Sequence, residues 1–289
     1  MRILMVHGRA QAAFKPEDLV LTWTDTLKAG FVAAKQPWPS RVEIDFPYYA
    51  TVLDAFAARA GLPTQADLVA KGAGGNAAYE QFMQSALEQI KDEAAITDVE
   101  VQAHLDPTAP QQKGIQNRWW FQAIVRAIDA RLGAVTNFTI EKALTDVFVY
   151  VTYPAVRKQI NAIIEAKLTA EPTIVIGHSL GSVVAYDVIM KNRAQLDLVK
   201  FVTVGSPLGI RAISSKLGVL QNPAGANGWY NAYDERDVVA LNPLDNRFFP
   251  VTPSIKNYNS VRNSTDNRHG IVGYLDDPDV AAHVAAALA

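Results

Sequence analysis

The sequence predicts an α/β fold in which a mostly parallel sheet of about six strands is flanked by helices. Three observations predict it. Short β-branched runs alternate with segments of helical periodicity through most of the chain. Several of these runs are apolar at nearly every position, as is typical of strands buried on both faces of a parallel sheet. The 289 residues are 49% apolar and 19% charged, which suits one large domain with a sizeable core.

The first fifty residues are expected to form a strand, a helix and a second strand. Residues 3–6 are a continuous apolar run that ends before a His-Gly pair. A helix is expected from Pro16, because proline followed by two acidic residues suits a first helical turn. The alternating stretch 41–46 predicts a strand nearer the edge of the sheet.

Residues 51–150 depart from this alternation and predict mainly helices. An insertion of this length between two core strands is typical of a helical cap or lid subdomain. The core is therefore expected at 1–50 and 151–289. Within the insertion, Trp119 and Trp120 are expected near one face of a helix, where they either line an acyl pocket or simply pack.

Strands and helices alternate again in the second half of the chain. A helix is expected at 156–164, then a strand at 173–176 followed by a helix to about residue 193. Three further strands are expected at 199–204, 229–233 and 255–258. An Ala-rich helix follows, and Asp279 is expected to be its N-cap.

The segment Gly177-His178-Ser179-Leu180-Gly181 lies between an expected strand and an expected helix. A serine on such a turn, with glycine two residues to either side, is typical of a nucleophile elbow. The tight turn strains the serine backbone and leaves no room for side chains at the two glycines. His178 is expected to point away from the serine as a filler of the variable position. The alternative is an ordinary turn with a bystander serine.

A nucleophilic serine needs a base to take its proton and an acid to orient that base. Functional groups of open α/β sheets gather at the carboxyl ends of the strands. Of the five histidines, His269 fits best, because it lies in a loop between the last expected strand and the last helix. The others end the first strand or lie beside the serine, in the insertion and in the final helix: His7, His178, His104 and His283.

Four acidic residues after strand 229–233 are candidates for the acid: Asp234, Glu235, Asp237 and, further on, Asp245. Asp237 is preferred because two valines follow it, and their packing would hold the carboxylate rigidly. Asp234 comes second, since it could instead cap the turn through its own backbone.

These residues together resemble the α/β-hydrolases of the lipase and esterase type, whose triad follows the order Ser179, Asp237, His269. The matching segments are Val6-His7-Gly8, Gly177-His178-Ser179-Leu180-Gly181, Gly205-Ser206-Pro207-Leu208, Asp237-Val238-Val239 and His269-Gly270. The resemblance covers about 1–50 and 150–289 and does not specify the insertion. It implies an α/β-hydrolase fold that lacks the first two strands, because the chain begins at what would be the family's third.

The resemblance also implies an oxyanion hole. One donor would be the backbone N–H of Leu180, and the other would come from the loop after the first strand, at Arg9 or Ala10. That loop carries one glycine rather than a run of them, so the choice between the two stays open. Further residues are candidates for lining the site: His7, Gly8, His178, Trp119 and Trp120.

The expected function is that of a serine carboxylesterase that acts on a small-molecule acyl substrate through an acyl-enzyme. Two alternatives stay open. One is thioesterase, peptidase or acyltransferase chemistry on the same triad. The other is a binding protein that has a hydrolase fold without catalysis.

Composition and motif content exclude several other classes of function. The absence of cysteine excludes disulfides, thiolate catalysis and zinc-thiolate sites. The formal net charge of −2 gives no global attraction to nucleic acid, which is not an expected partner. No cofactor or metal is expected, since neither a dinucleotide fingerprint nor metal-ligand spacing is present. No apolar run approaches the about 20 residues of a membrane span, and no signal peptide is apparent, so a cytoplasmic location is expected. The oligomeric state is not predicted.

Overall fold

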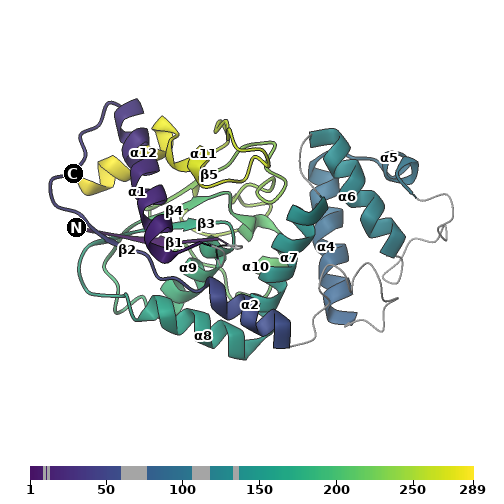
Figure 1. The fold of residues 1–289 in the computed structure, drawn as a ribbon, viewed down its shortest axis with the longest axis horizontal. Helices are drawn as coiled ribbons and strands as arrows, with labels where there is room; N and C mark the ends of the chain where they lie inside the picture. The colour runs from purple at the N-terminus through teal and green to yellow at the C-terminus, as the bar shows by residue number, and fades with distance from the viewer. Residues whose placement is uncertain (9–10, 12–13, 60–76, 106–117, 133–136) are drawn as a thin grey trace.

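The computed structural model describes residues 1–8, 11, 14–59, 77–105, 118–132 and 137–289. Its centre is an all-parallel sheet of six strands in the order β2-β1-β3-β4-β5-β6, which confirms the predicted fold class (Figure 1). The strands are β1 (Arg2–Val6), β2 (Glu43–Asp45), β3 (Thr173–His178), β4 (Leu198–Val204), β5 (Trp229–Ala232) and β6 (Lys256–Tyr258). Each lies at one of the six segments that the sequence predicts, and the two edge strands are the shortest.

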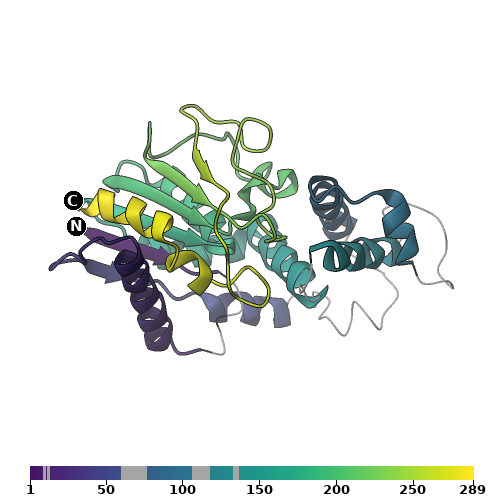
Figure 2. The ribbon, with the colours of Figure 1, turned by 90° about the horizontal axis from the view of Figure 1, so that it is seen from above.

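Successive side chains of each strand point to opposite faces of the sheet, and both faces are buried. Ile3 and Met5 pack into a cluster with α1 (Pro16–Ala33), α11 (Val272–Leu275) and α12 (Pro278–Leu288). Leu4 and Val6 pack into a second cluster with α8 (Pro154–Glu165), α9 (Leu180–Lys191) and α10 (Arg211–Ser214). Figure 1 shows the sheet between α1 and α12 above and α8 and α9 below, and Figure 2 looks down on the side that α1 and α12 cover. This double burial explains why the central strands are apolar at nearly every position.

The order in which the chain adds strands to the sheet changes direction at β1. This strand pairs with β2 on one side and with β3 on the other, and the chain then continues outward through β4, β5 and β6. In open α/β sheets, ligands bind beyond the carboxyl ends of the strands at such a switch point. Here those ends lead into His7 and Ser179.

Between β2 and α8, the described residues form five helices and no strand: α2 (Ala50–Arg59), α4 (Ala77–Glu93), α5 (Asp98–Ala103), α6 (Arg118–Leu132) and α7 (Asn137–Thr152). Helices α4, α5 and α6 form a layer at the right of Figure 1, beside the α/β core. Helix α7 packs against α4 and α6 on one side and against α8 and α9 on the other. It therefore joins this helical layer to the core.

A glutamine side chain ties the helical layer to the loop after β4. The side-chain amide of Gln89 on α4 donates to the carbonyl oxygen of Gly209 (2.8 Å) and accepts from the N–H of Arg211 (2.9 Å). Nearby, Arg247 forms an ion pair with Glu93 of the same helix (3.2 Å). These bonds connect α4 to the loop after β4 and to the segment between β5 and β6.

The start of the last helix corrects one prediction. The N-cap of α12 is Asp277, whose carboxylate accepts from the N–H groups of Asp279 and Val280, and Pro278 occupies the first turn. Asp279 instead accepts from the hydroxyl of Tyr258. Proline suits the first helical position and so moves the cap to the residue before it. Within the described ranges, no helix is both long and apolar enough to cross a membrane.

Candidate functional site

Ser179 lies on the sharp turn between β3 and α9, as the motif predicts. Its backbone is left-handed, with φ 52° and ψ −129°, a conformation that costs free energy for a residue with a side chain. The turn is held to the sheet by a hydrogen bond from the N–H of Ser179 to the carbonyl oxygen of Val204 (3.1 Å). The residue as a whole is only 2% exposed.

The two motif glycines allow the elbow to pack closely. A β-carbon at position 177 would lie 2.7 Å from the α-carbon of Ser182, which is closer than such atoms approach in proteins. A β-carbon at position 181 would overlap the carbonyl oxygens of Val6 and His7 at the end of β1. Helix α9 can therefore start directly above the β1–β3 pair only because both positions are glycine.

A continuous chain of hydrogen bonds joins Ser179, His269 and Asp237. The Oγ of Ser179 lies 2.8 Å from Nε2 of His269, and Nδ1 of His269 lies 2.7 Å from Oδ2 of Asp237. His269 is 7% exposed and Asp237 is 0% exposed. The three residues follow β3, β5 and β6, so the sheet brings together groups that are up to 90 residues apart.

The hydrogen-bond partners fix the proton positions in this chain. A carboxylate can only accept, so Nδ1 of His269 carries the hydrogen that is donated to Asp237. In the neutral ring, Nε2 is then the acceptor for the hydroxyl hydrogen of Ser179. The arrangement can remove a proton from the serine and hold the resulting positive charge on the imidazole beside a buried carboxylate.

Asp237 is held by two donors besides His269. Its Oδ1 accepts from the backbone N–H of Val239 (3.0 Å), and its Oδ2 accepts from the hydroxyl of Tyr274 (2.6 Å). Gly205 faces this carboxylate and the ring of His269 with a positive φ of 57°, and a β-carbon there would crowd both. Tyr274 was not among the residues that the sequence indicated for the site. The only signal was its position in the helix that starts shortly after His269.

The alternative acid, Asp234, has a different place in the structure. Its carboxylate accepts from the backbone and guanidinium of Arg236 and from the N–H of Asn263 (2.8 Å). It therefore anchors the start of the loop that carries His269, while the preferred residue, Asp237, contacts the imidazole. Glu235 lies at the surface against Asn259, and Asp245 is exposed.

Two further serines, Ser182 and Ser206, support the turn that carries Ser179. The hydroxyl of Ser182 donates to the carbonyl oxygen of Ser179 (2.6 Å) and lies 2.7 Å from the hydroxyl of Ser206, which follows β4. Ser206 in turn accepts from the N–H of Leu208 (3.3 Å). The Gly-Ser-Pro-Leu segment named in the sequence analysis thus braces the carbonyl of Ser179.

The end of β1 lies directly against the elbow. A β-carbon at Gly8 would lie 3.0 Å from the β-carbon of Ser179, so the backbone of this loop adjoins the serine. Leu180 is the first residue of α9, where helix N–H groups have no acceptor within the helix. The other expected oxyanion donors, Arg9 and Ala10, lie outside the described residues.

His7 is buried beside the site rather than in the hydrogen-bonded chain. Its Nδ1 lies 2.6 Å from the carbonyl oxygen of Gly8, and its Nε2 accepts from the N–H of Tyr49 (3.1 Å). The ring stacks on that of Tyr49. Burial lowers the pKa of His7 to about 4, so the ring stays neutral and keeps both bonds. His7 thereby links the loop after β1 to the start of α2.

His178 occupies the variable position of the motif, where we expected a filler side chain that points away from the serine. Its ring is buried, and its Nε2 lies 2.8 Å from the carbonyl oxygen of His269. The sequence gives no signal for this contact, because the two residues are 91 positions apart.

The remaining candidates lie away from the Ser179–His269–Asp237 chain of bonds. Trp120 is buried and its indole N–H donates to Glu88 on α4 (3.0 Å), whereas Trp119 is 40% exposed. Trp120 thus contributes to packing within the helical layer. His104 caps α5, and His283 on α12 packs against Tyr230.

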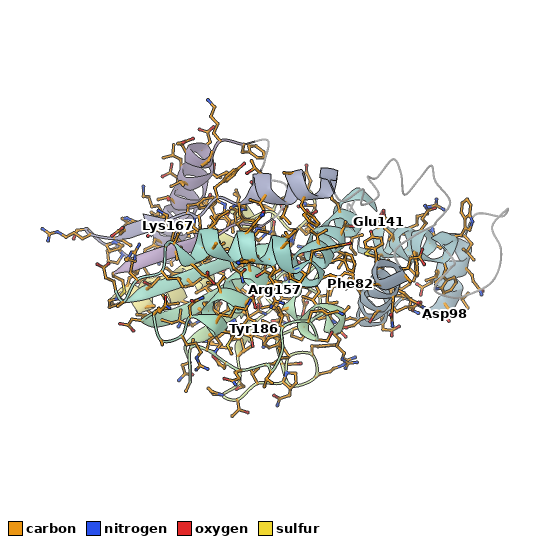
Figure 3. The ribbon with its side chains drawn as sticks, turned by 90° about the horizontal axis from the view of Figure 1, so that it is seen from below. Phe82, Asp98, Glu141, Arg157, Lys167 and Tyr186 are labelled. Atoms are coloured by element: carbon orange, nitrogen blue, oxygen red, sulfur yellow. The ribbon has the colours of Figure 1, made fainter. Side chains whose placement is uncertain are left out.

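A further buried carboxylate, that of Asp187, lies on α9 two turns after Ser179. Asp187 accepts from Arg157, in a two-pronged pair, from Lys191 (2.8 Å) and from Asn161 (2.7 Å). The hydroxyl of Tyr150 lies 3.0 Å from the same carboxylate. Figure 3 views this side of the molecule, with Arg157 labelled on α8.

A cavity of about 600 Å³ adjoins this network, between α8, α9 and residues 216–218. Its wall includes Asp187 and Arg157, whose polar atoms bond to each other and to neighbouring residues of the chain. The hydrogen-bonding groups of Asp187 and Arg157 therefore already have partners within the protein.

No group of three or more potential metal ligands occurs among the residues that the structure describes. No family model, curated protein or solved structure matches this chain.

Proposed function

We propose that the protein is a serine hydrolase of the α/β-hydrolase type that cleaves carboxylic esters. The observation that carries the proposal is the chain of hydrogen bonds from Ser179 through His269 to Asp237, at 2.8 and 2.7 Å. Nucleophile, base and acid are the three groups that acyl transfer to a serine requires. Further support comes from the strained elbow and from its place at the switch point of a parallel sheet.

In the proposed reaction, Oγ of Ser179 attacks the carbonyl carbon of the ester while Nε2 of His269 takes the hydroxyl proton. The π pair of the carbonyl moves to its oxygen, and backbone N–H groups of Leu180 and of the loop after β1 hold this oxyanion. Asp237 stabilises the imidazolium. The oxyanion then collapses, and the alcohol leaves with the proton from His269. The acyl group stays bonded to Ser179.

Water completes the proposed cycle. It gives a proton to Nε2 of His269 and attacks the acyl carbon, which forms a second oxyanion. Collapse breaks the bond to Oγ of Ser179, returns the proton to that oxygen and releases a carboxylic acid. The cycle consumes one ester and one water, and it produces one acid and one alcohol.

A fluorophosphonate probe tests the nucleophile. We expect it to label Ser179 of the wild type, and we expect Ser179→Ala to lose the label. The same substitution should lower kcat/KM for p-nitrophenyl butyrate on the order of 10⁴-fold or more. The control is Ser85→Ala, at an exposed serine of α4, which should keep both label and activity.

Two results would contradict this proposal. One is a label on a residue other than Ser179, and the other is near-full esterase activity in Ser179→Ala. A folded wild type that takes no label would instead favour a binding protein. A panel of esters, acyl-CoA thioesters and peptides then identifies the preferred leaving group.

A further inference from the structure

His178 lies at the centre of a small aromatic cluster beside the elbow. Its ring centroid is 5.0 Å from that of His269 and 6.1 Å from those of Trp23 and Tyr274. These rings come from α1, from the loop after β6 and from α11. The His178 side chain lies among these rings with Nε2 toward the backbone of His269.

The acceptor determines which form of His178 is present. A carbonyl oxygen only accepts, so Nε2 of His178 must carry a hydrogen to bond the carbonyl of His269. Burial, and after it the neighbouring His269, hold the pKa of His178 well below its usual range. The ring is therefore neutral with its one proton on Nε2, while Nδ1 lies beside Gly8.

The loop that carries His269 is shaped mainly by its own side chains. Asn267 accepts from the N–H of His269 (3.1 Å), Asn263 donates to the carbonyl of Gly270 (2.8 Å), and Thr265 accepts from the N–H of Gly270 (2.9 Å). The bond from His178 differs, because it joins this loop to β3. It places the backbone of His269 itself relative to the sheet, whereas the bond from the N–H of Asn263 to Asp234 anchors only the start of the loop.

We propose that His178 is a positioning residue that fixes the backbone of His269 at the distance at which its imidazole reaches Ser179. The proposal rests on the proposed function. His178 and Ser179 are neighbours on one strained turn, so the nucleophile and the anchor of its base move as one unit. Without the anchor, a shift of about 1 Å would take the imidazole out of hydrogen-bond range, and misplacements of that size cost roughly 100-fold in rate.

Two substitutions of nearly equal shape separate the hydrogen bond from packing. His178→Gln keeps an N–H donor at a reach similar to that of Nε2, and His178→Met fills the same space without a donor. We expect kcat with p-nitrophenyl butyrate to fall roughly 10- to 100-fold in the Met variant, with KM within threefold of wild type. The Gln variant should stay within about threefold of wild type in kcat.

A spectroscopic readout does not depend on turnover. The hydrogen between Nδ1 of His269 and Asp237 should give a low-field proton resonance in the wild type. We expect this resonance to shift or broaden in the Met variant and to persist in the Gln variant, while the two variants have the same Tm. A purely structural role of His178 would move Tm and leave the resonance of the folded protein unchanged.

The outcomes separate this inference from the proposed function. A folded wild type without label or turnover defeats the proposed reaction, yet the resonance still decides whether His178 positions His269. The positioning role is overturned if the Met variant keeps both the resonance and the labelling rate of the Gln variant. It is equally overturned if both variants lose activity and Tm to the same extent, because packing alone would then explain the loss.

Discussion

Asp237 and Asp187 are both buried carboxylates, and a buried tyrosine hydroxyl lies against each, from Tyr274 and Tyr150 respectively. They differ in the cation that they face. Asp187 meets the permanently charged Arg157 together with a lysine, and its remaining lone pairs are taken by neutral donors. Asp237 meets the imidazole of His269, a ring whose other nitrogen lies against the hydroxyl of Ser179.

The comparison shows that the group beside a buried aspartate decides what the carboxylate can do. The guanidinium beside Asp187 cannot release its proton, so that pair can only hold α8 against α9. The imidazole beside Asp237 has a second nitrogen, which contacts Ser179. The network of Asp187 consists of groups that bond to one another, whereas that of Asp237 continues to Ser179, the proposed nucleophile. Four substitutions test this comparison.

Asp237→Asn should have the largest effect. An amide in place of the carboxylate can donate to Nδ1 of His269 and so favour the wrong tautomer, and we expect kcat/KM for p-nitrophenyl butyrate to fall on the order of 10⁴-fold. Asp245→Asn, at an exposed carboxylate that the sequence also offered as the acid, is the control and should keep full activity. Activity of Asp237→Asn within tenfold of wild type would contradict the claim that Asp237, unlike Asp187, acts on activity.

Asp187→Asn should act on stability instead. Removing the carboxylate leaves Arg157 and Lys191 without their shared partner, and because both cations remain partly exposed to water we expect a loss of roughly 1–3 kcal/mol in free energy of unfolding. Urea denaturation measures this loss. The kcat/KM of the folded variant should stay within twofold of wild type, and a large loss there would show that the two networks are coupled.

The same carboxylate predicts a pH dependence. Burial alone would raise the pKa of Asp187, but hydrogen bonds from Arg157, Lys191 and Asn161 outweigh it and lower the pKa to about 2. A pKa below that of the unfolded chain means that the contribution to stability is full above about pH 4 and is lost as the pH falls toward 2. Denaturation between these values should show a component that Asp187→Asn lacks.

Tyr274→Phe should have a smaller effect, and on activity. It removes one of the two other donors to Asp237, so the carboxylate is held less firmly against His269. A hydrogen bond to a charged group is worth about 1.5–3 kcal/mol, and we expect kcat to fall at least about tenfold with KM unchanged. Unchanged kcat would show that Val239 alone is enough to hold the carboxylate.

Tyr150→Phe is the matched change at the other carboxylate and should have the smallest effect. Asp187 keeps its bonds to Arg157, Lys191 and Asn161, so we expect about 1 kcal/mol less free energy of unfolding and the kcat of wild type. A tenfold loss of kcat in this variant would contradict the separation between the two networks.

The strands could be predicted because each carries its own signal. Residues 3–6 and 173–176 are continuous apolar runs, which a strand buried on both faces requires. The start of α12 was placed two residues too far along, because two aspartates flank Pro278 and only the position of the proline decides between them.

The candidate site could be predicted only in part. The Gly-x-Ser-x-Gly motif indicated Ser179, and chain order with the carboxyl-end rule indicated His269. The preference for Asp237 over Asp234 rested on the apolar residues that follow it. The contact of His178 with His269 was not foreseen, and Tyr274 was missed. Both contact the site through single hydrogen bonds between residues far apart in sequence, and local patterns carry no signal for such pairs.

The pairing of β1 with β3 has a consequence for how the chain is made. The register joins Arg2 to Thr173, so the middle of the sheet brings together segments separated by about 170 residues. A ribosome that adds 5–20 residues per second needs roughly 10–30 s to synthesise that length. During this time the apolar β1 has no β3 with which to pair. The sheet around the elbow can therefore form only after more than half of the chain has been translated.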